Sequence, residues 1–199
     1  MPYVIENNEQ YARRTPLVFG AVLILCFIFL LLAFRSIIVP LKAIILNVFS
    51  TAAAFGVLTL VFQYWYGVSW NYGVIESFVP PLLFSILFGL SMDYHVFLLS
   101  RIREESLKGI ELETAVQSGI TLTSGAITSA ALIMVAVFTI ISMLELPIMK
   151  ELGVGLAAAI LIDATLIRSI MLPASMVLLG DLNWYLPSWL NWLPGIKTE

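Results

Sequence analysis

Five long apolar stretches dominate the sequence and restrict what it can fold into. They cover approximately residues 17–34, 39–62, 78–100, 120–143 and 152–172. A helix that crosses the hydrocarbon core of a bilayer needs about 20 predominantly apolar residues, and each stretch is long enough. Because backbone polar groups inside a bilayer must be satisfied internally, such stretches fold as helices. We therefore predict an all-α, polytopic membrane protein with five transmembrane helices.

The composition separates this chain from soluble and nucleic-acid-binding proteins. Of its 199 residues, 60% are hydrophobic and 12% are charged, whereas about a quarter of the residues of a soluble domain are charged. The formal net charge is -3 and the sequence contains no basic run, so a nucleic-acid partner is not expected. With one cysteine and one histidine, the sequence offers no cluster for a metal or a cofactor.

The apolar stretches divide the chain into three parts. We expect a polar N-terminal segment over residues 1–16, a transmembrane domain over 17–180 and an aromatic tail over 181–199. The tryptophans and leucines of the tail are interrupted by Pro187, which favours a segment lying in the membrane interface over a sixth span. The aromatic run 64–73, between the second and third stretches, is also expected at the interface.

Basic residues near the ends of the apolar stretches predict how the chain is oriented in the membrane. Cytoplasmic segments carry an excess of Lys and Arg. The polar connector 101–117, predicted to be a short amphipathic helix, carries several of the basic residues on one side. We therefore predict a multi-pass protein of the cell (inner) membrane with its N-terminus outside and its C-terminus in the cytoplasm. The basic residues on the cytoplasmic side are Arg35, Lys42, Arg101, Arg103, Lys108 and Arg168.

Asp93 lies inside the third apolar stretch and is followed by Tyr94. An ionisable residue in a span is costly and is a functional-site hypothesis by default. Ser85 and Gly89 share its helix face, where small side chains let a second helix approach closely. Consecutive helical residues point about 100° apart, so Asp93 and Tyr94 need partners on other helices. Two interpretations stay open: a carboxyl that carries protons, and a structural carboxyl bonded across a helix interface.

The fifth stretch contains Asp163 and Arg168, which are five positions apart. An ion pair within an α-helix needs a spacing of three or four. We therefore expect each to pair with another element, or Arg168 to reach the interface by snorkelling. His95, in the third stretch, is either a proton carrier or a buried, hydrogen-bonded histidine. Gly153 and Gly155 predict close helix packing.

Two intramembrane acids also permit a different chemistry. Asp93 and Asp163 are candidates for the dyad of an intramembrane aspartyl protease. The presenilin-like pattern, Tyr-Asp in one span and Gly-x-Gly-Asp in another, is absent, because Asp163 follows Ala-Ile-Leu-Ile. Proton-coupled transport is therefore the favoured function, and no enzymatic activity is expected.

Several motifs, in order along the chain, resemble the MMPL family of the RND transporter superfamily. The resemblance runs from about residue 15 to residue 193. The motifs are FRS at 34–36, VPLK at 39–42, FGLSMDYHVFLLSRIREE at 88–105, ITSAALIMV at 127–135, LGVGLA at 152–157, DATLIR at 163–168, LPA at 172–174 and NWYLP at 183–187.

The resemblance implies a proton-driven exporter of lipids or other hydrophobic molecules. Full-length proteins of the family have twelve spans in two similar halves, each with an extracytoplasmic porter domain. An Asp-Tyr pair in the fourth span of each half forms the proton relay. Asp93-Tyr94 matches the pair of the second half, so the chain corresponds to spans eight to twelve. Ser91, His95, Asp163 and Arg168 are then supporting polar residues of the core.

The sequence contains no porter domain, no seventh span and no first half. Within the chain, Asp93 and Tyr94 therefore lack the partners that the family provides. The two halves of the family are related by a two-fold axis, so two copies of this chain can supply each other, and we expect a homodimer on that ground. The alternative is a non-transporting fragment or assembly subunit that needs a second half with a porter domain. His95 stands where the family often has Glu.

Overall fold

The computed structural model of the chain describes residues 2–65 and 75–190, and these residues are helical throughout most of their length, without a strand. The helices are α1 (Pro2–Phe34), α2 (Ile38–Thr59), α3 (Val79–Leu107), α4 (Leu112–Ser142), α5 (Pro147–Ile162) and α6 (Leu172–Leu179). Two π-helical segments extend α2 and α5, η1 (Leu60–Trp65) and η2 (Asp163–Met171), and two 3₁₀ turns follow α6, η3 (Gly180–Trp184) and η4 (Ser188–Leu190).

Five helical runs of the described residues are long and apolar enough to cross a membrane. They are Arg14–Phe34, Ile38–Tyr64, Val79–Leu107, Leu112–Ser142 and Pro147–Trp184. The prediction of an all-α, polytopic protein with five spans is confirmed. The π-helical segment η2 and helix α6 lengthen the fifth run, because they continue α5 without a break.

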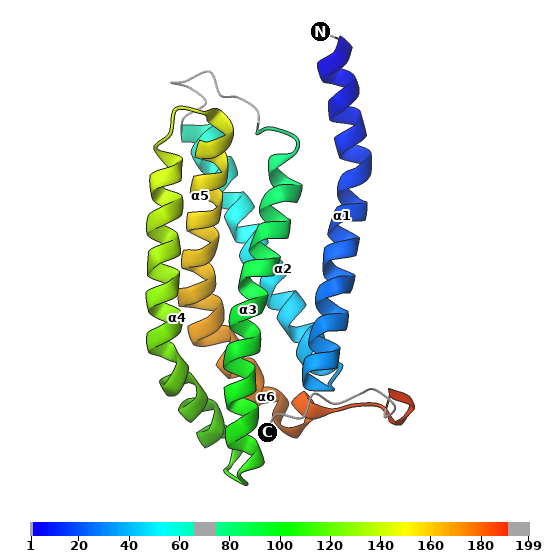
Figure 1. Cartoon of the computed structure of the whole chain (residues 1–199), viewed down its shortest axis with the longest axis vertical. Helices are drawn as coiled ribbons and strands as arrows, with labels where there is room; N and C mark the ends of the chain where they lie inside the picture. The colour runs from blue at the N-terminus through cyan, green and yellow to red at the C-terminus, as the bar shows by residue number, and fades with distance from the viewer. Residues whose placement is uncertain (1, 66–74, 191–199) are drawn as a thin grey trace.

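The helices form a bundle in which α2, α3, α4 and α5 pack together and α1 lies beside α2 and α3 (Figure 1). The N-terminal half of α1 stands apart from the other helices in this view. One apolar core cluster lies between α2, α3 and α5, with Leu58, Leu83 and Leu156 among its members. A second cluster joins α1, α2, α3, α4 and α6 at the other end and includes Phe34, Leu99 and Leu172.

Helices α4 and α5 approach each other closely at Gly153. A Cβ atom added there would lie 2.7 Å from the carbonyl oxygen of Phe138 and 2.5 Å from the backbone nitrogen of Ser142. Gly155, two residues further, faces the side chains of Leu58 and Leu83 at similarly short range. The predicted role of both glycines in close helix packing is confirmed.

Substituting Gly153 by Ala is therefore expected to destabilise the protein by about 1–3 kcal/mol, the usual effect of overpacking a close-packed interior. The measurement is the thermal unfolding midpoint of the purified chain in detergent. Gly125→Ala is the matched control, because a Cβ at Gly125 of α4 meets nothing within 4 Å. A Gly153→Ala variant as stable as Gly125→Ala would contradict the close approach of the two helices.

The connector after the third span differs from its prediction. No separate amphipathic helix covers residues 101–117: α3 continues to Leu107 and α4 begins at Leu112. Gly109, with φ +78°, lies in the turn between them. The apolar residues of the connector continue the buried faces of the two spans, as Ile102 and Val116 show, which is why both helices extend past the hydrophobic stretches.

The tail turns away from α6 and runs across one end of the bundle (Figure 1). The hydroxyl of Ser36 donates to the carbonyl oxygen of Asn183 at 2.6 Å, and the backbone N–H of Ile37 donates to that of Tyr185 at 3.2 Å. The ammonium of Lys42, buried here, donates to the side-chain oxygen of Asn183 at 2.8 Å. The turn between α1 and α2 and the first part of α2 thus hold the tail at Asn183 and Tyr185. Residues 191–199 of the predicted tail, and residues 66–74 of the predicted aromatic belt, lie outside the described residues.

α1 begins at Pro2, so the polar segment predicted over residues 1–16 continues into the first span as one helix.

Candidate functional site

Asp163 and Arg168 form an ion pair inside the bundle, where only 4% and 6% of their surfaces are exposed. The expectations that they do not pair with each other and that Arg168 snorkels to the interface are wrong. The reason is the π-helical backbone of η2, whose hydrogen bonds join residues five apart. Ser169, which donates to the carbonyl oxygen of Ala164 at 2.9 Å, shows the same spacing. The wider turn brings the two charges to one face.

Ser91 of α3 links this ion pair to α2. Its hydroxyl lies 3.1 Å from Oδ2 of Asp163 and 2.6 Å from Oδ1 of Asn47, and it can donate its single proton to one of them at a time. All three side chains are buried. Asn47 was not predicted as a site residue from the sequence. The sequence feature that could have identified it is its side-chain amide inside an apolar span, because such amides usually form hydrogen bonds to other helices.

His95, one turn after Ser91 on α3, completes the buried cluster. Its Nδ1 lies 2.9 Å from the carbonyl oxygen of Ser91, and only 1% of the residue is exposed. Among the described residues, Nε2 of His95, Oδ1 of Asp163 and Nε of Arg168 have no hydrogen-bond partner. Buried polar atoms are normally paired, so this cluster retains hydrogen-bonding capacity for a further group.

Tyr94 lies between this buried cluster and the outside of the bundle. The guanidinium carbon of Arg168 is 4.4 Å from the centroid of its ring, a cation–π contact. Its hydroxyl group donates to the sulfur of Met134 on α4 at 3.3 Å. Tyr94 is half-buried. One face of the ring thus touches the ion pair, and the residue is coupled electrostatically to Asp93 as well.

Asp93 lies on the outer face of α3, apart from the buried cluster. It is exposed and has no hydrogen-bond or ion-pair partner among the described residues. Leu82, Ile86, Gly89 and Phe97 are exposed on the same helix at spacings of three and four, so they form one stripe with Asp93. We call these five residues the α3 stripe. Exposing a carboxylate to lipid costs a large amount of free energy. The α3 stripe therefore needs a polar or protein environment.

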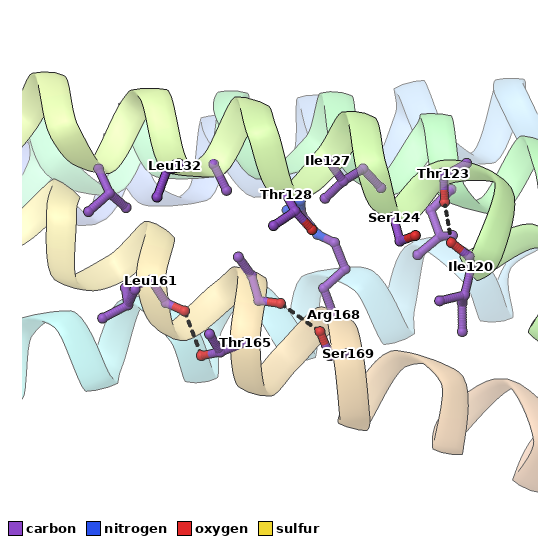
Figure 2. A pocket seen from close by; sticks show the side chains of 14 residues that line it. Ile120, Thr123, Ser124, Ile127, Thr128, Leu132, Leu161, Thr165, Arg168 and Ser169 are labelled. Atoms are coloured by element: carbon purple, nitrogen blue, oxygen red, sulfur yellow. Dashed lines mark hydrogen bonds between the residues drawn. The ribbon is translucent and has the colours of Figure 1, made fainter.

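A cavity of about 270 Å³ opens beside the buried cluster, between α4 and the region where α5 continues into η2. Figure 2 shows the side chain of Arg168 reaching from η2 toward Thr128 of α4. The lining is apolar apart from Arg168 and a set of hydroxyls, several of which donate to their own helix backbone, such as Thr165 to Leu161. The hydroxyl residues are Thr123, Ser124, Thr128, Thr165 and Ser169. Through this cavity the buried arginine contacts open space.

Within the described residues, the structure thus brings Tyr94, Ser91, His95, Asp163 and Arg168 together and leaves Asp93 on the other side of Tyr94. Asp93 lies on the outer face of α3 and Asp163 lies in the core, so the structure does not bring the two acids of the considered protease dyad together. The described residues also contain no group of His, Cys, Asp and Glu that could hold a metal ion.

Comparisons with known proteins identify relatives across almost the whole chain. A family model described as the MMPL family matches residues 3–191. The mycolic acid-containing lipids exporter MmpL11 of Mycolicibacterium smegmatis is 40% identical over 98% of this chain and 21% of its own length. The heme uptake protein MmpL11 of Mycobacterium tuberculosis is also 40% identical, over 98% and 20%. The trehalose monomycolate exporter MmpL3 of the same species is 35% identical over 93% and 20%.

The chain therefore spans about a fifth of the length of these curated relatives. The family match covers both the spans and the polar cluster. By this match and by its bundle of five apolar helices, the chain belongs to the MMPL family of the RND transporter superfamily.

Proposed function

We propose that this chain is the transmembrane, proton-coupling part of an exporter of lipids or other hydrophobic molecules, driven by the proton-motive force. Asp93 is the proton carrier and Tyr94 is its partner. The observation that supports this best is the position of Asp93: an unpaired carboxyl in the middle of an apolar helix face, with a charged cluster directly behind Tyr94. The lipid exporters among the relatives support the substrate class.

Protonation of Asp93 changes both its charge and its hydrogen bonding. The ionised carboxylate only accepts hydrogen bonds, whereas the protonated carboxyl also donates one. The α3 stripe therefore meets an opposing helix as an anion in one state and as a neutral surface in the other. The guanidinium of Arg168, paired with Asp163, contacts the ring of Tyr94 and holds it in place. Such a two-state interface is what coupling of proton flow to transport requires.

The group that faces the α3 stripe is a second half-bundle. Carboxylates in a membrane face the bundle interior or water, and in this chain alone the stripe faces outward. The second half is either another copy of this chain, which offers Asp93 to Tyr94 of its partner, or the first half of a transporter with its porter domain. In the second case the chain does not transport by itself.

The mass of the purified chain in mild detergent separates these two partners. A homodimer is expected, with twice the 22.1 kDa of one chain. A Gly89→Trp variant, which places a large side chain in the middle of the α3 stripe, is expected to shift the chain to a monomer, whereas Leu122→Trp on the exposed face of α4 leaves the dimer intact. A wild-type chain that is only monomeric contradicts the homodimer.

Tyr94→Phe tests the relay without disturbing the fold. The phenyl ring keeps the contact with Arg168, while the hydroxyl that reaches Met134 is lost. In the proposed relay the hydroxyl binds the carboxylate of the second half. A hydrogen bond to a charged group contributes about 1.5–3 kcal/mol, so proton-driven export is expected to fall about tenfold or more. The measurement is the export rate at a fixed pH gradient, normalised to the amount of protein in the membrane. An unchanged rate would remove Tyr94 from the relay.

We further propose that the end of the bundle that holds Arg35, Arg103 and Lys108 is cytoplasmic, as the excess of basic residues there indicates. Lys108 lies outside the spans, and its hydrogen bond to Glu105 raises the pKa of its ammonium, so the group is fully charged at neutral pH. The protein then lies in the inner membrane with its N-terminus outside.

A further inference from the structure

A pair of arginines and a tryptophan gather at the end of the bundle where α1, α3 and the tail meet (Figure 1). A guanidinium nitrogen of Arg103 on α3 donates to the carbonyl oxygen of Phe34 at the end of α1. Its guanidinium carbon lies 5.2 Å from the centroid of the Trp184 ring. Arg35 follows Phe34, and its like charge acts on Arg103. Both arginines are half-buried, and their positive charges lie near enough to each other to interact at this end of the bundle.

Arg35 has a strained backbone conformation. Arg35 has φ +48°, in the left-handed region that residues with a Cβ atom rarely adopt. Its N–H donates to the carbonyl oxygen of Leu31 at 2.8 Å, which closes the end of α1. Glycine is the usual residue in this capping position. Strained backbone conformations that the surrounding structure holds in place cluster at functional positions.

The nearby carboxylates do not neutralise Arg103. Glu104 pairs with Arg101 at 2.7 Å, and Glu105 pairs with Lys108 at 2.7 Å. Among the described residues, Arg103 has no carboxylate partner. Guanidinium groups bind phosphate oxygens in a bidentate geometry that other cations do not match. The indole of Trp184 is of the type that lies at the level of lipid headgroups.

We propose that Arg35 and Arg103 bind the phosphate of an anionic phospholipid headgroup, with Trp184 stacked against the guanidinium of Arg103. Basic sites between transmembrane helices at the membrane surface bind anionic headgroups in this way. The site lies at the end of the bundle, on different residues from the Asp93 relay, and does not depend on the proposed transport function. It fixes the α1–α2 turn and the tail, which meet there, to the membrane surface.

The test measures thermal unfolding of the full purified chain in a neutral detergent, with added phosphatidylglycerol or phosphatidylcholine. For the wild type, phosphatidylglycerol is expected to raise the unfolding midpoint by roughly 5–10 °C more than phosphatidylcholine, as a ligand at about a hundredfold its Kd does for a chain of this size. Arg103→Gln is expected to lose this difference. Arg35→Gly is expected to lose it too, although glycine relieves the backbone strain and leaves the lipid-free midpoint unchanged or higher.

Arg101→Gln is the matched control, because it removes the same charge from an exposed arginine two residues from Arg103. It is expected to keep the full effect of phosphatidylglycerol. The proposal is overturned if Arg35→Gly and Arg103→Gln keep the effect, or if Arg101→Gln loses as much as they do. It is also overturned if inorganic phosphate alone stabilises the wild type to the same extent, since the ligand is then a free anion.

Discussion

Asp93→Asn is expected to abolish proton-driven export while leaving the protein folded in the membrane. Asparagine has nearly the shape of aspartate but cannot take up or release a proton. Asp93 has no partner in the described part of the bundle, so its loss removes no contact on which folding of the bundle depends. The measurements are the export rate under an imposed pH gradient and the thermal unfolding midpoint of the purified variant.

Asp181→Asn is the matched control for this experiment. Asp181 is an exposed acid of the tail, and its replacement makes the same chemical change away from the α3 stripe. It is expected to leave export unchanged. Normal transport by Asp93→Asn would overturn the proton-carrier role of Asp93.

Arg168→Met is expected to destabilise the protein by about 3–5 kcal/mol, because it leaves the carboxylate of Asp163 buried without its partner. It also removes the cation from the ring of Tyr94. The double variant Asp163→Asn with Arg168→Met leaves no unpaired charge and is expected to recover part of the lost stability. Unfolding midpoints in detergent measure both effects.

Arg101→Gln is the reference variant for the loss of stability expected from Arg168→Met. It breaks the pair of Arg101 with Glu104, in which both side chains are about half exposed, and such surface pairs contribute about 0–1 kcal/mol. If Arg168→Met is no more destabilising than Arg101→Gln, the Asp163–Arg168 pair does not organise the core.

The spans were predictable because length and hydropathy determine which segments cross a membrane. The ends of the helices were not, since α3 and α4 extend into the connector to bury Ile102 and Val116. The pairing of Asp163 with Arg168 was missed because it depends on a π-helical turn, which changes the residues that share a face and has no signature in composition.

The separation of the polar residues into two sets also needed the structure. In sequence, Ser91, Asp93 and His95 lie within five positions of α3, and nothing in the apolar context shows which of them face inward. Packing against α2 and η2 buries Ser91 and His95 and turns Asp93 outward. The positive φ of Arg35 was equally unpredictable, because it belongs to the turn in which α1 ends.

The α3 stripe is expected to face a second half-bundle. Disulfide cross-linking in the membrane tests it directly, in a Cys26→Ala background that removes the single native cysteine. A cysteine at Gly89 fits without displacing neighbours, because a Cβ there meets nothing within 4 Å. It is expected to cross-link efficiently to a second copy, or to a cysteine introduced in the first half of the transporter, whereas Leu122→Cys on the exposed face of α4 does not. If Gly89→Cys cross-links no better than Leu122→Cys, and both react equally with a lipid-soluble thiol reagent, the stripe faces lipid and the claim is contradicted.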